Sequence, residues 1–136
     1  MEEHQLNILS AEDDLDDQFL LKKAINKADI GGRIDFVPDG KSLIERLTKQ
    51  YEGHLPDILL IDLNMPIMDG LEVLKVLREH EGINDLPVII LTTSNEQKDI
   101  DRCYGLGAKS FITKPDSFDE LVEVAKSFYK FKKWFM

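Results

Sequence analysis

The feature of this chain that most constrains its fold is a regular alternation of short apolar runs with helical patterns. Each apolar run is four to six residues long and is flanked by Gly, Pro, Asp or Asn, which predicts strands. Three of the runs are almost entirely aliphatic, as is typical of strands buried on both faces. The predicted strands span residues 6–11, 33–37, 58–61, 88–92 and 109–112.

Apolar residues at helical spacing lie between these strands. A more polar helix is expected over residues 96–104, and the last helix is expected to run from about 117 to about 134. This order of elements predicts an α/β fold of the (βα)₅ type, a doubly wound parallel sheet with right-handed crossovers and helices on both faces. The stripe expected to pack the first helix comprises Leu15, Phe19, Leu20, Ala24 and Ile25.

The length and net charge of the chain limit which classes of function are possible. We expect the 136 residues to form one domain, 1–136, without an output domain. A net charge of −9 repels phosphate backbones, so we expect no nucleic acid partner. The single cysteine, Cys103, suits a reducing compartment, and we expect it to be a packing residue on a helix rather than a redox sensor. With no signal peptide and no apolar run long enough for a membrane span, we expect a cytoplasmic protein.

Polar residues follow the predicted strands, at the edge of the sheet where doubly wound folds place their sites. Glu12 and Asp13 follow the first strand, Asp62 the third and Lys114 the fifth, while Thr92 closes the fourth. Carboxylates gathered in one crevice repel one another unless a cation neutralises them, and oxygen ligands alone favour Mg²⁺. Lys and Thr donors suit phosphoryl oxygens. These residues therefore predict Mg²⁺-assisted phosphoryl chemistry with a carboxylate as nucleophile.

Four segments, residues 8–14, 58–70, 87–92 and 107–115, resemble the receiver domain of two-component response regulators, the CheY family. The resemblance covers roughly residues 5–130. It implies a flavodoxin-like, CheY-like sheet of strand order 2-1-3-4-5. It also implies a single-domain signalling protein that catalyses only its own phosphotransfer and autodephosphorylation, rather than an enzyme acting on other substrates.

The resemblance further implies that Asp62 accepts a phosphoryl group from a histidine kinase or phosphotransfer protein. Asp13, Asp62 and the backbone carbonyl of Asn64 would bind Mg²⁺, with Glu12 reaching the ion through water. The signal would then leave through contact with a downstream protein target.

Lys114 and Thr92 would contact the phosphoryl group. Thr92 and Phe111 would form a conformational switch, in which the Phe111 ring turns inward as Thr92 moves toward the phosphoryl group. The family often has a small residue where this chain has Thr93, and we favour Thr92 over Thr93 on the spacing. Phe111 lacks the hydroxyl of the commoner tyrosine, so the switch would act by packing. The resemblance also implies a cis peptide bond before Pro115.

Other readings of these residues remain open. Asp14, Asp16 and Asp17 are interpreted as a solvated helix start without a chemical role. A phosphatase of the haloacid dehalogenase type also uses a nucleophilic Asp with Thr and Lys, but Asn64 stands where that family has a second aspartate. A pseudo-receiver that acts only as a binding module is the third alternative.

The aromatic tail is the part that the resemblance explains least. Tyr129, Phe131 and Trp134 add aromatic area beyond the stripe that would pack on the sheet. We predict either an extended last helix packed on its own domain or a surface for a homodimer or another partner.

Overall fold

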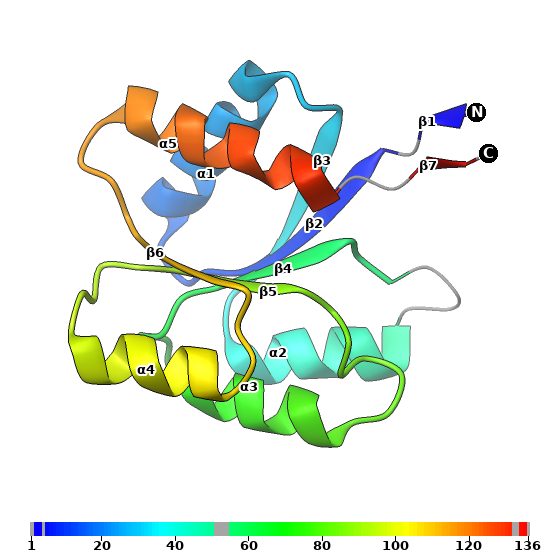
Figure 1. Cartoon of the computed structure of the whole chain (residues 1–136), viewed down its shortest axis with the longest axis vertical. Coiled ribbons are helices and arrows are strands. Elements are labelled where there is room, and N and C mark those ends of the chain that lie inside the picture. The colour runs from blue at the N-terminus through cyan, green and yellow to red at the C-terminus, as the bar shows by residue number, and fades with distance from the viewer. Residues whose placement is uncertain (1, 4, 51–54, 132–133, 136) are drawn as a thin grey trace.

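Five parallel strands form the central sheet in the computed structural model, which describes residues 2–3, 5–50, 55–131 and 134–135. The strand order is β3-β2-β4-β5-β6, which is 2-1-3-4-5 when these strands are numbered along the chain, as predicted (Figure 1). The strands are β2 (Leu6–Ala11), β3 (Gly32–Val37), β4 (Ile58–Ile61), β5 (Val88–Thr92) and β6 (Ser110–Thr113).

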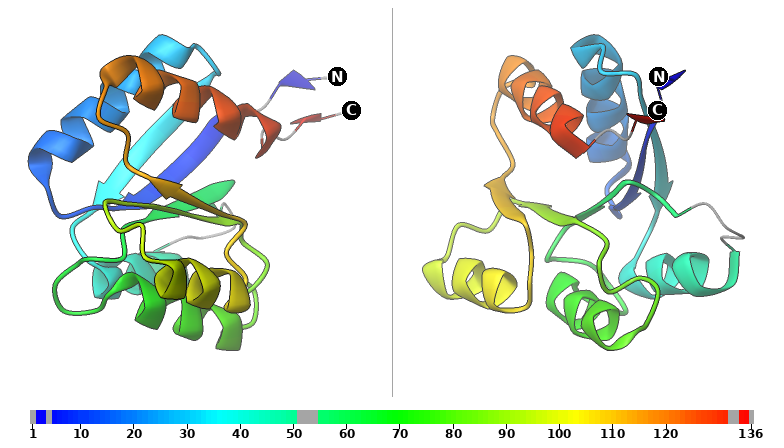
Figure 2. Two further views of the ribbon diagram at one scale, coloured as in Figure 1. Left: turned by 60° about the vertical axis from the view of Figure 1, so that its left-hand side comes forward. Right: turned by 45° about the vertical axis from the view of Figure 1, so that its right-hand side comes forward.

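Helices cover both faces of this sheet, which confirms the doubly wound α/β fold (Figures 1 and 2). Helices α1 and α5 lie on one face, and α2, α3 and α4 lie on the other. Helix α2 continues as a π-helical turn over Arg46–Gln50. The helices are α1 (Leu15–Ala28), α2 (Gly40–Glu45), α3 (Gly70–Glu79), α4 (Gln97–Gly105) and α5 (Phe118–Lys126). Among the described residues, no helix is long and apolar enough to span a bilayer.

Strand β4 shows how the sequence builds two cores from one sheet. Its four residues are all buried, and successive side chains of a strand point to opposite faces. Ile58 and Leu60 join the core beneath α1 and α5, whereas Leu59 and Ile61 join the core above α2, α3 and α4. Each such side chain contributes about 1.5–3 kcal/mol through burial. The continuous aliphatic run is therefore required by the helices on both faces.

The entry into α3 is held closely to the loop that follows β4. Asp69 caps the helix by accepting a hydrogen bond from the Glu72 amide, and the Glu72 side chain accepts one from the Asp69 amide. A Cβ atom on Gly70 would come within 2.9 Å of the Asp62 carbonyl oxygen and the Leu63 Cα. Only glycine permits this approach, which fixes Asp62 against the start of α3.

The first half of α1 packs differently from the prediction. Leu15 and Phe19 are 76% and 64% exposed, and the buried stripe consists instead of Leu21, Ala24 and Ile25. One turn before Leu21 that inward face holds Asp17 and Gln18, because it points at the polar end of the sheet rather than at a core. The expected stripe was therefore wrong at Leu15, Phe19 and Leu20, which is 41% exposed, and right at Ala24 and Ile25.

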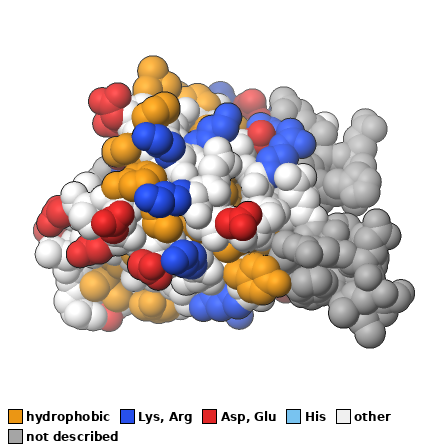
Figure 3. All heavy atoms as spheres, turned by 90° about the horizontal axis from the view of Figure 1, so that it is seen from above, with side chains coloured by type: hydrophobic (Ala, Val, Ile, Leu, Met, Phe, Trp, Pro, Cys, Tyr) orange, Lys and Arg blue, Asp and Glu red, His pale blue; other side chains and the backbone are white. Residues whose placement is uncertain are grey.

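Lysine side chains lie over the exposed ring of Phe19 on α1 and the half-buried ring of Phe118 on α5. The Lys23 ammonium lies 5.7 Å from the Phe19 ring centre and 5.8 Å from that of Phe118, and Lys27 lies 5.7 Å from Phe118. Figure 3 shows lysine or arginine side chains interleaved with hydrophobic ones over this face. Cation–π contacts of this kind stabilise an exposed site by about 0.5–1 kcal/mol each.

The C-terminal segment also departs from the prediction, because α5 ends at Lys126 and does not continue to about 134. A 3₁₀ helix follows over Ser127–Phe131, and Trp134–Phe135 forms a strand, β7, antiparallel to β1 (Glu2–Glu3). The tighter turn places Phe128 fully inside the core, and the strand pairing supplies backbone hydrogen bonds that a longer helix would have made. The side chains of Trp134 and Phe135, and residues 132–133, lie outside the described residues, and a dimer or partner surface stays a prediction.

We expect Arg78→Ala to lower the free energy of unfolding by about 2 kcal/mol, because hydrogen bonds from a charged donor would be lost. The Arg78 guanidinium donates to the carbonyl oxygens of Leu106 at 2.5 Å, Asn84 at 2.6 Å and Gly107 at 3.0 Å, joining α3 to two loops. Urea unfolding of both proteins measures the change. Arg102→Ala, at an exposed position on α4, serves as the control, and equal stability of the two variants would contradict this role.

We expect Cys103 to resist alkylation in the native protein. Burial, together with the nearby Asp99, raises the pKa of its thiol to about 11, so little thiolate exists at pH 8. Iodoacetamide labelling followed by mass spectrometry should be at least about tenfold slower in buffer than in guanidinium chloride, because the nucleophile is the thiolate. Equal rates in both conditions would show that the thiol is accessible.

Candidate functional site

The predicted site residues converge at one edge of the sheet. Glu12 and Asp13 directly follow β2, Asp62 follows β4, Thr92 ends β5 and Lys114 follows β6. Because parallel strands end at the same edge, side chains far apart in sequence meet there. The structure thus brings together the five side chains that sequence analysis singled out.

Asp62 lies at the centre of the site and is only 7% exposed. Its Oδ1 accepts hydrogen bonds from the Thr92 hydroxyl at 2.8 Å and from the Asn64 backbone amide at 3.1 Å. Its Oδ2 accepts one from the Lys114 ammonium at 2.9 Å. Both oxygens are therefore held in place by donors suited to an ionised carboxylate.

Lys114 contacts three carboxylates at once. Its Nζ lies 2.6 Å from Glu12 Oε1, 2.7 Å from Asp17 Oδ2 and 2.9 Å from Asp62 Oδ2. Burial by itself would lower the pKa of Lys114, but the hydrogen bonds to Asp17, Glu12 and Asp62 outweigh burial and hold the pKa above its usual range. The ammonium therefore stays charged throughout the range of neutral pH.

Glu12 is the most buried acid of the site, at 5% exposed. Burial raises the pKa of its carboxyl above the usual value, and the hydrogen bonds from Lys114 and the Asp14 amide counter burial only in part. The Glu12 backbone carbonyl oxygen also accepts a hydrogen bond from the side-chain amide of Gln18 at 2.7 Å. The segment after β2 is thus anchored to the start of α1.

Three acids form a group that can hold a metal ion. Glu12, Asp13 and Asp62 each offer a carboxylate oxygen, and these three atoms lie within 4.8 Å of one another. Asp13 is exposed, whereas the other two are buried, so the group opens to solvent on the Asp13 side. An all-oxygen donor set of this kind fits a hard divalent cation.

The register of the two threonines is clear from their surroundings. Thr92 is fully buried and bonded to Asp62, whereas Thr93 is exposed. The next residue, Ser94, donates its hydroxyl to Asp99 in the first turn of α4 at 2.8 Å. The chain after β5 therefore joins the Asp62 site to helix α4.

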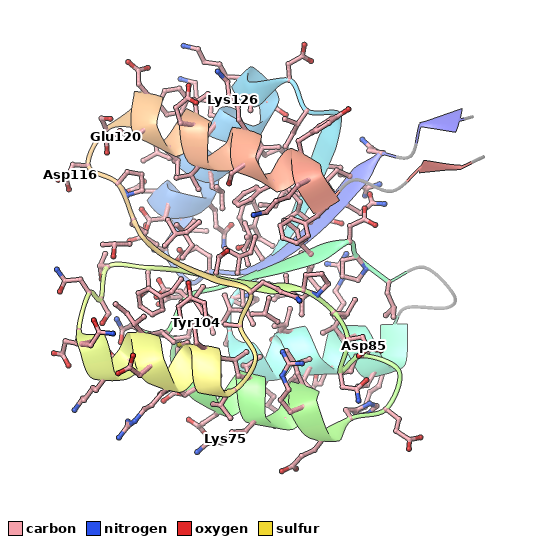
Figure 4. The ribbon with its side chains drawn as sticks, in the orientation of Figure 1. Lys75, Asp85, Tyr104, Asp116, Glu120 and Lys126 are labelled. Atoms are coloured by element: carbon pink, nitrogen blue, oxygen red, sulfur yellow. The ribbon has the colours of Figure 1, made fainter. Side chains whose placement is uncertain are left out.

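Phe111 lies within β6, and its half-buried ring packs against the core on the α4 side. Its backbone amide donates a hydrogen bond to the hydroxyl of Tyr104 on α4 at 3.1 Å. Figure 4 shows Tyr104 between α4 and the sheet. This bond ties the backbone of β6 to helix α4.

Asp17 is a site residue that sequence reasoning missed. Of the acids interpreted as a helix start, Asp14 does cap α1, accepting from the amides of Asp16 and Asp17. Asp17, however, reaches inward to Lys114. Asp17 lies four residues before the buried Leu21 and so on the same face of α1, which was the signal available.

The loop after Asp62 carries backbone strain. Ile67 has φ of 70°, and the Met68 amide donates to the Pro66 carbonyl oxygen at 2.7 Å, which closes a three-residue turn. A β-branched residue rarely adopts positive φ, and its side chain here is 74% exposed.

The expected cis bond before Pro115 is absent, and that peptide is trans.

Comparison with known proteins identifies the class. The response regulator receiver domain model matches residues 8–126, most of the chain, so this chain belongs to the response regulator receiver family. A curated relative is the probable methanogenesis regulatory protein FilR2 of Methanothrix harundinacea. It is 35% identical over 128 residues, which is 90% of this chain and 82% of FilR2.

Solved structures show the same fold. The phosphorylated cyanobacterial phytochrome response regulator RcpA has a TM-score of 0.84 and 29% identity, over 94% of each chain. The Mn²⁺-bound form of response regulator Rcp1, a protein of Synechocystis, has a TM-score of 0.79 and 28% identity, over 92% of each chain. This protein is thus a CheY-like receiver of two-component signalling.

We expect Ile67→Asn to raise the free energy of unfolding by about 1 kcal/mol, since asparagine accepts positive φ more readily and backbone strain costs about 1–3 kcal/mol. Thermal and urea unfolding measure the change. Leu15→Asn, at another exposed apolar residue, controls for loss of surface hydrophobicity. If Ile67→Asn were less stable than the parent protein, this account of the turn would be wrong.

Proposed function

We propose that this receiver is phosphorylated on Asp62 by a histidine kinase or a phosphotransfer protein. The observation that supports this proposal is the buried Asp62 carboxylate, oriented by Thr92, the Asn64 amide and Lys114. A carboxylate fixed in this way is held in one orientation for attack on phosphorus. The phosphorylated state of the similar protein RcpA is consistent with it.

The proposed transfer is a displacement at phosphorus. An Asp62 oxygen forms the new P–O bond while the P–N bond of the donor phosphohistidine breaks. The electron pair of that bond stays on the imidazole nitrogen, which takes a proton from solvent. The Lys114 ammonium and the Thr92 hydroxyl then exchange their bonds to Asp62 for bonds to phosphoryl oxygens. The products are an acyl phosphate on Asp62 and a neutral histidine.

We propose Mg²⁺ as the cofactor of this site. Asp13, Asp62 and the backbone carbonyl of Asn64 would hold it, with Glu12 reaching it through water. When bound, the ion would offset negative charge on the phosphoryl oxygens. The carboxylate cluster supports a hard cation, and the similar protein Rcp1 has been solved with Mn²⁺.

We propose that Thr92 and Phe111 transmit the phosphorylation to a protein-binding surface. Thr92 already bonds to Asp62, and Phe111 lies on the neighbouring strand, bonded to Tyr104 of α4. Movement of the Thr92 hydroxyl toward the phosphoryl group would open space against which the Phe111 ring repacks. The result is a changed surface around α4 and β6.

We propose that the protein acts in a cytoplasmic signalling pathway, between a histidine kinase or phosphotransfer protein and a downstream protein target. We propose no enzyme activity beyond phosphotransfer to Asp62 and autodephosphorylation.

Asn64 and Ser94 are proposed to tune the lifetime of the acyl phosphate; unchanged dephosphorylation rates after substitution of both would overturn this. The phosphatase and pseudo-receiver alternatives are not favoured, because the receiver model covers the chain and the site residues converge.

We expect acetyl phosphate with Mg²⁺ to add one labile phosphoryl group to the protein, detected as a mass increase of the intact chain. Asp62→Asn should show no gain, and neither should the parent protein with chelator. Asp57→Asn, at a buried aspartate before β4, is the matched control and should still be labelled if it remains folded. A stable mass gain in Asp62→Asn, or none in the folded parent protein, would overturn the proposal.

A further inference from the structure

A groove of about 460 Å³ lies between helices α3 and α4, away from the Asp62 site. It is lined by Leu71 and Lys75 of α3, Arg102 of α4 and Leu106 at the end of α4. Figure 4 shows α3 and α4 side by side, with Lys75 on the side of this layer that faces away from the sheet.

The groove combines an apolar floor with a basic rim. Leu71 and Leu106 are half-buried and pack against the core beneath α3 and α4. Lys75 and Arg102 are exposed, and each lies one helical turn from one of these leucines. Each helix thus presents one apolar and one cationic side chain to the same groove.

The two cations are free to bind a partner. Within the described part of the chain, neither Lys75 nor Arg102 forms an ion pair within 4.0 Å. The acids of α4 are engaged elsewhere: Asp99 accepts a hydrogen bond from Ser94, and Asp101 accepts one from Gln97. In a chain of net charge −9, this groove is therefore a local basic site.

We propose that the α3–α4 groove binds an acidic segment of a partner protein, with an apolar side chain on the leucine floor and carboxylates on Lys75 and Arg102. Grooves between two helices accept amphipathic segments in this way. The net charge of −9 disfavours nucleic acid, because a polyanion longer than the groove would meet a surface on which acidic side chains outnumber basic ones. None of the four residues that line the groove belongs to the Asp62 site.

The test is an NMR titration of the full, ¹⁵N-labelled chain with a synthetic amphipathic peptide of Glu and Leu. The peptide is about 15 residues long, near the shortest length for an isolated helix. A second peptide carries Gln in place of Glu. The variant Lys75→Gln/Arg102→Gln is compared with Lys22→Gln/Lys41→Gln, which removes two exposed cations from α1 and α2. Unfolding curves verify that both variants fold.

The proposal expects saturable amide shifts confined to α3, α4 and the residues following α4. Loss of both cations should weaken binding about fivefold, and the control variant should match the parent protein. Added salt should weaken binding as well. Equal binding of the Gln peptide, equal binding of a single-stranded oligonucleotide, or no saturable shift would each overturn it. Groove shifts that depend on protein concentration without peptide would assign the groove to a second copy of the chain instead.

Discussion

The ammonium group of Lys114 is the charge on which the site depends. Glu12, Asp17 and Asp62 come from three different elements, and their carboxylates meet within 3 Å of one nitrogen atom. Without a cation these acids would repel one another at a sparsely hydrated edge of the sheet. Because Lys114 follows β6, its ion pairs join the end of the last parallel strand to the ends of β2 and β4. The same ion pairs therefore neutralise the acids of the site and hold these strand ends together.

The same polar centre determines how the neighbouring elements pack. The inward face of α1 is apolar where it covers the core but carries Asp17 and Gln18 where it faces Lys114 and Glu12. Leu15 and Phe19 consequently lie on the outside. On the other side, the loop after Asp62 is held by Gly70 and the α3 cap, and it accommodates the strained Ile67 turn. A rigid surround of this kind keeps the Asp62 carboxylate oriented.

Helix α4 is hydrogen-bonded both to the segment after Thr92 and to strand β6. Ser94, two residues beyond Thr92, bonds to Asp99 at the start of α4, and Tyr104 near its end bonds to the backbone of Phe111. The start of the helix is thus tied to the segment after Thr92, and its end to β6, the strand that Lys114 follows. The outer side of the same helix forms one wall of the basic groove, so a partner bound there would contact an element that is hydrogen-bonded to the segment after Thr92.

The sequence by itself determined the order of strands and helices and the residues at the strand ends, because aliphatic runs, caps and glycines act locally. It therefore predicted Glu12, Asp13, Asp62, Thr92 and Lys114 as one cluster. Tertiary structure alone decided which face of α1 is buried, since that depends on whether a core or a charged site lies opposite. It also placed Asp17 on Lys114 and ended the last helix at Lys126, where pairing of β7 with β1 replaces helical hydrogen bonds. Such choices rest on contacts between distant segments, which local patterns do not encode.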